Sequence, residues 1–149
     1  LILEGEETGK PAKHVETGCI AEINEWDMPQ LGILQIQALG TERFHIEDFH
    51  IESNGLIIAS ATYVAPEPAQ ALPANHHACA TLLQRLIEHL GEARFKPPLN
   101  YNDSVWVSYR LAELLPLKLS VRQNMLEMND SQVRIEILYR FLVQQGLLA

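Results

Sequence analysis

The hydrophobic residues of this chain change their spacing once, and that change constrains the fold more than any other feature of the sequence. Up to residue 64 they recur with a period near two, as in strands whose side chains alternate between two faces. From residue 75 onward the period is near 3.6, which is the repeat of an α-helix. The sequence therefore predicts an α+β fold in which a β-rich lobe precedes an α-helical lobe.

The segment between the two patterns, APEPAQALP, holds three prolines in nine residues. Because proline fixes φ and lacks a backbone donor, such a stretch is typical of a stiff, extended connector. We therefore predict a β-rich lobe at residues 1–64, a Pro-rich connector at 65–74 and a helical lobe at 75–149, which together form one domain.

The alternation in the first lobe predicts five short strands. They cover residues 1–3, 15–23, 33–39, 43–51 and 56–64. Asn54 and Gly55 tolerate positive φ and lie between two of these runs, which indicates a tight hairpin turn. Several short antiparallel strands in so few residues predict a small barrel or a strongly curled sheet. The chain starts at Leu1 without a Met and within a strand, so we expect the first strand of the lobe to be missing.

The helical lobe opens with the most regular apolar stripe of the chain. Its members recur three or four residues apart, at Cys79, Leu82, Leu83, Leu86, Ile87 and Leu90. Asn75 is the predicted N-cap of this helix, and Gly91 follows its last apolar position, where a C-terminal glycine commonly stands.

Residues 102–128 predict a helix, a forced stop and a second helix. Asp103 or Ser104 can cap the first helix by accepting a bond from a free backbone N–H. Pro116 cannot donate a backbone bond and disfavours helix at Leu115, so the first helix is expected to end there.

Two further helices are predicted after this stop. Ser120 and Gln123 form the S-x-x-Q pattern of a capping box, which predicts the start of the second helix. Asp130 or Ser131 is the expected cap of the last helix, and Gly146 is the expected end. Leu83 in the first helix and Leu115 at the stop are predicted core residues.

Composition excludes several classes of protein. Nineteen acidic residues against eleven basic ones give a formal net charge of −8, which opposes nonspecific binding to nucleic acid. Cys19 and Cys79 are too few for a disulfide framework and lie in apolar periodic segments, so free buried thiols in a reducing, cytoplasmic compartment are expected. The apolar runs are too short to span a bilayer, and the first residues lack the basic region of a signal peptide.

No catalytic or phosphate-binding pattern is complete. Residues 5–11, GEETGKP, have the wrong glycine spacing for a phosphate loop and a Pro after the Lys, so a turn is the simpler interpretation. Ser108 lies within a predicted helix without the turn of a nucleophile elbow. Lys118 near Ser120 is explained as part of a helix junction.

We also interpret the paired histidines and two aromatic residues as structural. His76 and His77 are adjacent and point about 100° apart on a helix, so we expect first-turn surface residues rather than metal ligands. His45 and His50 are expected on opposite faces of a strand. The aromatic side chains of Trp26 and Tyr63 are predicted to pack in the core or to be half-buried at strand ends, although a contact role stays open.

Three segments carry a resemblance to a known family: GEETGKPAKHVETGCIAEI, LQIQALGTERFHI and VSYRLAELLPLKLSVRQNMLEMNDSQVRIEIL. The third, with its Leu-rich helix, Pro116, the Arg122-Gln123 pair and Arg134, is the most specific. With these segments, nearly the whole chain resembles the N-terminal, substrate-recognition domain of the Lon protease family. The resemblance implies a β lobe similar to the PUA-like pseudo-barrel followed by a helical lobe.

The family resemblance also implies a function. The protein is expected to be a stand-alone, non-catalytic module of bacterial type that recognises unfolded or degradation-prone polypeptide, or another protein. No catalytic, cofactor-binding or metal-ligating residue is predicted, no cofactor is expected, and the substrate-binding residues stay open. The alternative is a PUA-like barrel that binds RNA or a small ligand. Binding to nucleic acid requires a basic patch on one face. Its candidate members are Lys10, Lys13, Arg43, Arg94 and Lys96.

Overall fold

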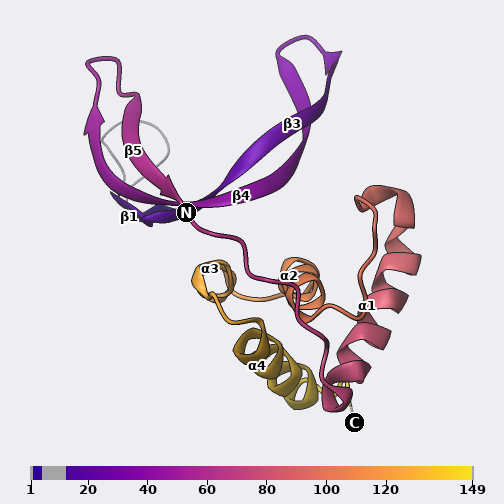
Figure 1. Cartoon of the computed structure of the whole chain (residues 1–149). Helices are drawn as coiled ribbons and strands as arrows, with labels where there is room; N and C mark the ends of the chain where they lie inside the picture. Colours follow the sequence, from indigo (N-terminus) through magenta and orange to yellow (C-terminus); the bar gives the residue numbers. More distant parts are fainter. Residues whose placement is uncertain (1, 5–12, 149) are drawn as a thin grey trace. The chain divides into compact units, whose positions relative to one another are not determined.

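The computed structural model describes residues 2–4 and 13–148 (Figure 1). The chain divides into two compact units, Leu1–Pro66 and Glu67–Ala149. The division falls inside the Pro-rich segment. Strands lie in the first unit and helices in the second, so the predicted α+β order is confirmed. Closure of the strands into a PUA-like pseudo-barrel stays a prediction, as does the division into lobes at residues 64 and 75.

The β unit holds two antiparallel sheets in its described part. Strands β1 (Ile2–Glu4) and β2 (Lys13–His14) pair with each other. The larger sheet has the order β3-β4-β5, formed by Thr17–Gln30, Ile33–Ile51 and Ile57–Tyr63. The central strand β4 pairs with β3 along its first part and with β5 along its last part. The segment of residues 5–11 discussed above lies outside the described residues.

Strand β4 replaces the two separate strands predicted at residues 33–39 and 43–51, so that prediction was wrong. Gly40 pairs with Ala21 and Arg43 pairs with Cys19, so the chain stays in the ladder through the predicted break. The register shifts between these pairs, and Thr41 donates its hydroxyl to the Ile20 carbonyl over 3.3 Å. A bulge therefore absorbs the residues that interrupt the apolar alternation.

The predicted hairpin at Asn54 and Gly55 is confirmed between β4 and β5. Gly55 adopts a φ of +85°, a left-handed backbone conformation that glycine reaches at the least cost. The side chain of Asn54 accepts a hydrogen bond from the Leu56 N–H at 2.9 Å, and Gly55 N–H donates to the Glu52 carbonyl at 2.9 Å. Local backbone chemistry alone accounts for this turn.

The helical unit contains four α-helices in its described part: α1 (His77–Leu90), α2 (Ser104–Leu114), α3 (Leu119–Glu127) and α4 (Ser131–Gln144). Two short 3-10 turns, η1 (Ala74–His76) and η2 (Glu92–Arg94), flank α1. All buried hydrophobic residues of the described chain belong to this unit. They are Leu72, Cys79, Leu83, Ile87, Val107, Leu111, Ala112, Leu115, Met125, Ile135, Leu138 and Leu142.

Most predicted helix ends are confirmed. The Asp103 carboxylate caps α2 by accepting from the Val105 N–H, and α2 ends at Leu115 before Pro116. Asp130 caps α4 in the same way. Helix α4 ends with Gly146 at a φ of +69°, where the Gly146 N–H donates to Val143 and the Leu147 N–H to Leu142. Those two bonds satisfy carbonyls that the helix itself leaves unpaired.

Two predicted caps were wrong. Asn75 lies inside η1, and α1 follows His76 without a side-chain cap. Helix α3 begins after Lys118, whose carbonyl accepts from the Val121 and Arg122 N–H groups, so Ser120 already lies within the first turn. Gln123 donates along the helix to Glu127 at 2.7 Å. Helix α3 therefore begins two residues earlier than the capping box indicated, whereas α1 begins one residue later than an Asn75 cap would place it.

A buried ion pair holds the helical unit together around Arg134 on α4. Its guanidinium lies 2.8 Å from the Glu67 carboxylate, and the two side chains are 0% and 5% exposed. Arg134 also donates to the Ser108 hydroxyl at 2.8 Å and to the Met128 carbonyl at 2.7 Å. It stacks 3.7 Å from the centre of the Tyr109 ring. The start of the second unit is therefore fastened to α2 and α4 by one fully buried cation.

Candidate functional site

The most unusual surface of the β unit is one face of the β3–β4 hairpin. The strand register pairs Ile23 with Ala38 and Trp26 with Ile36, so these side chains lie on the same side of the ladder. Leu34 precedes Ile36 by two residues and shares that side. We call Ile23, Trp26, Leu34 and Ile36 the apolar face of the hairpin.

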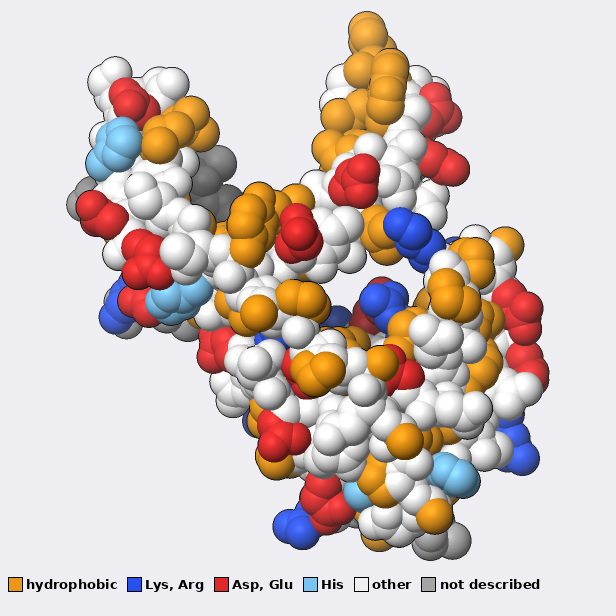
Figure 2. Space-filling model, viewed as in Figure 1, with side chains coloured by type: hydrophobic (Ala, Val, Ile, Leu, Met, Phe, Trp, Pro, Cys, Tyr) orange, Lys and Arg blue, Asp and Glu red, His pale blue; other side chains and the backbone are white. Residues whose placement is uncertain are grey.

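The apolar face is open to solvent. Each of its four side chains is more than half exposed, and Trp26 is 71% exposed. Figure 2 shows hydrophobic side chains gathered along the projecting end of this hairpin. Contiguous exposed apolar patches of this kind mark surfaces at which proteins contact other molecules.

The opposite face of the same hairpin carries its acidic side chains, together with Gln35, Gln37 and the apolar Ile33 and Leu39. The register pairs Glu22 with Leu39, Glu25 with Gln37 and Asp27 with Gln35, which places these three carboxylates on the side away from Trp26. Residues 21–40 contain these three acids and neither Lys nor Arg. We call Glu22, Glu25 and Asp27 the acidic face of the hairpin.

The exposure of the two strand aromatics corrects the sequence interpretation. Trp26 and Tyr63 were predicted to pack in a core or to be half-buried, but they are 71% and 66% exposed. The physical reason is the absence of a covering layer among the described residues of Leu1–Pro66, in which Arg43 is the one buried residue. Alternation shows which side chains share a face, but it does not show whether another element covers that face.

Sequence reasoning also missed the turn that forms the hairpin. Gln30 pairs with Ile33 across a two-residue loop of Leu31 and Gly32, and Gly32 adopts a φ of +85°. Leu31 is 92% exposed at the tip. A partial signal was present, since Gly32 directly precedes the apolar run of residues 33–39, but the mostly polar residues 24–30 before the turn do not resemble a strand. The turn joins β3 and β4, which are both much longer than the strands predicted from the sequence.

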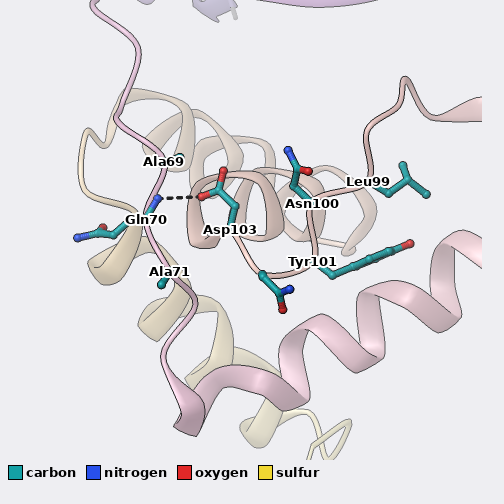
Figure 3. Close-up of a pocket in the computed structure, with 8 residues that line it drawn as sticks. Ala69, Gln70, Ala71, Leu99, Asn100, Tyr101 and Asp103 are labelled. Carbon is teal, nitrogen blue, oxygen red and sulfur yellow. Dashed lines mark hydrogen bonds between the residues drawn. The ribbon is translucent and has the colours of Figure 1, made fainter.

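The helical unit contains a cavity of about 480 Å³ beside the start of α2 (Figure 3). It is lined by residues 69–71 and 99–103. Part of its polar lining serves the fold, because the Asp103 carboxylate that caps α2 also accepts from the Gln70 N–H at 3.1 Å, and Ala71 bridges Asp103. The buried Tyr101 hydroxyl, by contrast, has no hydrogen-bond partner among the described residues. We interpret the cavity as a packing gap between the backbone segments of residues 69–71 and 99–103.

Histidine 76 is not the surface residue that the sequence predicted. The η1 turn directs His76 inward, where it is 5% exposed and its Nε2 lies 2.8 Å from a Glu136 oxygen on α4. That hydrogen bond and a second one from Arg140 hold the pKa of Glu136 below its usual value. His77 is exposed. His76 thus joins the start of α1 to α4.

The remaining titratable candidates do not assemble into a site. His45 lies beside Thr17 and Glu16, whereas His50 pairs with Glu52. Among the residues that the structure describes, no group of three or more His, Cys, Asp or Glu side chains is arranged to hold a metal ion. Within the same residues, no helix is long and apolar enough to cross a bilayer.

Both thiols are free, but Cys19 is only half-buried, so the prediction of two buried thiols was wrong for Cys19. Cys79 is buried in α1, where burial and then the nearby Glu136 carboxylate raise the pKa of the thiol to about 11. A protonated, inaccessible thiol is a poor nucleophile and a poor metal ligand. Cys79 therefore serves packing, as does the Ser108 hydroxyl, which is buried and bonded to Val105 and Arg134.

The architecture defines the class of this protein: an α+β domain in which a β unit with an exposed apolar hairpin precedes a compact helical unit. The chain belongs to the family of the ATP-dependent protease La (LON) substrate-binding domain, whose model matches residues 4–144. A search of curated proteins found no match. Among solved structures, the chain is similar to a Lon N-terminal domain protein from Xanthomonas campestris, at 28% identity and a TM-score of 0.70. That match covers 85% of this chain and 68% of the other.

Proposed function

We propose that this domain binds unfolded or degradation-prone polypeptide, or a partner protein that exposes an apolar segment, through the apolar face of the hairpin. The observation that carries the proposal is the alignment of four exposed, large apolar side chains on one side of β3 and β4. The family description, a substrate-binding domain of a protease, supports polypeptide as the ligand. The domain holds its ligand without a chemical step and without a cofactor.

The expected affinity is modest. Burying one large apolar side chain stabilises a complex by about 1.5–3 kcal/mol, whereas association itself costs roughly 4–15 kcal/mol. The few side chains of the apolar face therefore support weak, reversible binding. Weak binding suits a module that binds polypeptides of many different sequences, because no deep pocket selects one of them. We place the module in the cytoplasm, since free thiols fit a reducing compartment.

Fluorescence anisotropy with a labelled, permanently unfolded protein tests the proposal. The variant Trp26→Ser with Ile36→Ser removes two neighbouring side chains of the apolar face. The control, Gln35→Ser with Gln37→Ser, changes the other face of the same strand. Since loss of two apolar contacts is worth about 3 kcal/mol or more, the first variant is expected to weaken binding by more than tenfold, and the control by less than twofold.

Equal weakening by both variants would place the binding surface elsewhere. A single-stranded RNA in the same assay distinguishes the alternative function. Apolar binding persists as salt rises, whereas binding to phosphates weakens steeply because counterions are no longer released favourably. The acidic residues of the hairpin lead us to expect no RNA signal. Salt-sensitive RNA binding without polypeptide binding would refute the proposal, as would cleavage of the polypeptide.

A further inference from the structure

The hairpin has a second property besides its apolar face, which is an unpaired backbone edge. Strand β4 pairs with β5 only from Phe44 to Ile51, whereas β3 pairs with it on the other side down to Ile33. Within the described part of the chain, residues 33–42 of β4 therefore have a strand neighbour on one side alone. The backbone N–H and C=O groups on the other side are open to a further strand.

This edge lacks the features that natural proteins use to block strand addition. Residues 33–39, ILQIQAL, contain no proline and no charged side chain, and residues 35–40 of β4 pair without an extra residue on their own strand. The outer edge of β3 is different. Its register shifts between Ile23 and Glu25 and again between Asp27 and Gln30. Bulges of this kind disfavour pairing, so β4 offers the better edge.

We propose that the ligand adds to residues 33–39 of β4 as an extra, extended strand. This inference rests on the proposed function and specifies how the polypeptide is held. The backbone of the ligand forms hydrogen bonds with the β4 edge whatever its sequence. Every second side chain of the added strand then lies beside Leu34, Ile36 and the rest of the apolar face. An unfolded chain is a suitable occupant because its backbone groups are unpaired.

The acidic face determines which segments bind best. The alternate side chains of an added strand point toward the side that carries Glu22, Glu25 and Asp27. Those acids lie two strand spacings away, about 10 Å, which is within reach of a Lys or Arg side chain and of the order of one Debye length. Between residues 21 and 40 the sequence has no Lys or Arg whose charge could offset these three exposed carboxylates. The preferred ligand is therefore an extended segment in which apolar residues alternate with Lys or Arg.

Backbone methylation of a peptide tests the proposal directly. The probe is a labelled peptide of about eight residues that alternates Val and Lys, matched in length to a typical strand. Two further peptides carry N-methyl groups on only the odd or only the even residues. A strand added at one edge uses the N–H groups of one set alone, so one methylated peptide is expected to lose about tenfold or more in affinity, and the other to bind nearly as the parent does.

The outcomes separate this inference from the proposed function. If both methylated peptides bind as well as the parent, side-chain docking operates without strand addition, which overturns the inference and leaves the proposed function intact. If neither the parent peptide nor the unfolded protein binds, the proposed function itself fails. Hydrogen exchange adds a check on the free protein. Outward amides of residues 33–39 are expected to exchange fast and to slow on binding, and slow exchange before binding would show that the edge is already covered.

A double variant tests whether the acidic face selects ligands that carry Lys or Arg. Glu25→Gln with Asp27→Asn keeps the shape of the exposed side chains and removes two of the three acids. The full chain is expected to prefer the Val-Lys peptide to a Val-Glu peptide by about tenfold at low salt, and the variant by less than threefold. An unchanged preference in the variant would overturn the assignment of the acidic face as the selective element.

Discussion

The buried ion pair between Arg134 and Glu67 allows a sharp prediction about stability. The two side chains are 0% and 5% exposed, and the guanidinium also supports the Ser108 hydroxyl and the Met128 carbonyl. Glu67→Gln removes the compensating charge but leaves Arg134 buried. Because an uncompensated buried charge typically costs about 3–5 kcal/mol, this single change is expected to lower the free energy of unfolding of the helical unit by that amount.

The double variant determines whether the cost arises from the pair. Arg134→Met leaves the Glu67 carboxylate with the Tyr109 hydroxyl as donor at 2.9 Å, so it is also expected to destabilise. Combining Arg134→Met with Glu67→Gln removes both charges from the interior. The free energy of unfolding that the double variant loses is expected to be smaller than the sum of the two single losses, by about 2 kcal/mol or more.

Urea unfolding followed by tryptophan fluorescence measures these free energies. The chain has two tryptophans, and Trp106 lies in the helical unit with its ring edge-on to Tyr101. A Trp26→Phe background makes Trp106 the sole reporter, so unfolding of the β unit does not enter the signal. A cost below about 1 kcal/mol for Glu67→Gln, or strict additivity in the double variant, would refute the reasoning about the buried pair.

The other predictions concern the core, acid stability and the β unit. Leu83→Ala and Leu115→Ala, at 0% and 3% exposure, are each expected to destabilise by about 2–5 kcal/mol in the same urea assay, and unchanged midpoints would contradict the helix packing. Hydrogen bonds from His76 and Arg140 lower the pKa of Glu136 in the folded state, so the stability it contributes is present above its ordinary value of 4.5 and is lost as pH falls through the lower folded value. Glu136→Gln is therefore expected to flatten the loss of stability below pH 4.5, which acid titration by circular dichroism would detect. Arg43→Ala is expected to destabilise the β unit without weakening polypeptide binding, because Arg43 is buried; normal stability with lost binding would reverse that assignment.

Sequence patterns predicted the helical unit well where the cause is local. Asp103, Pro116, Asp130 and Gly146 act on backbone groups within a few residues, so each marks a helix end whatever the rest of the chain does. The capping box at Ser120 failed because α3 begins two residues earlier, with the Lys118 carbonyl accepting its first backbone bonds. A competing local structure of that kind is not visible in a short motif.

The candidate site was predicted only in part. Strand alternation indicates that Trp26 and Ile36 occupy apolar positions, but their sharing of one face depends on the register across the Leu31-Gly32 turn and on the register shift between Asp27 and Gln30. Whether that face is buried depends on other elements of the chain. The expectation that Trp26 packs in a core failed for this reason.

The sequence by itself determined the order of the β and helical parts, the hairpin at Asn54-Gly55 and most helix ends, because these features depend on periodicity and on backbone bonds between near neighbours. Only the tertiary structure decided the burial of His76 against Glu136, the pairing of Arg134 with Glu67 and the exposure of the apolar face. Each of these depends on residues far apart in the chain, and the burial of a side chain is a property of what packs over it. No local pattern contains that information.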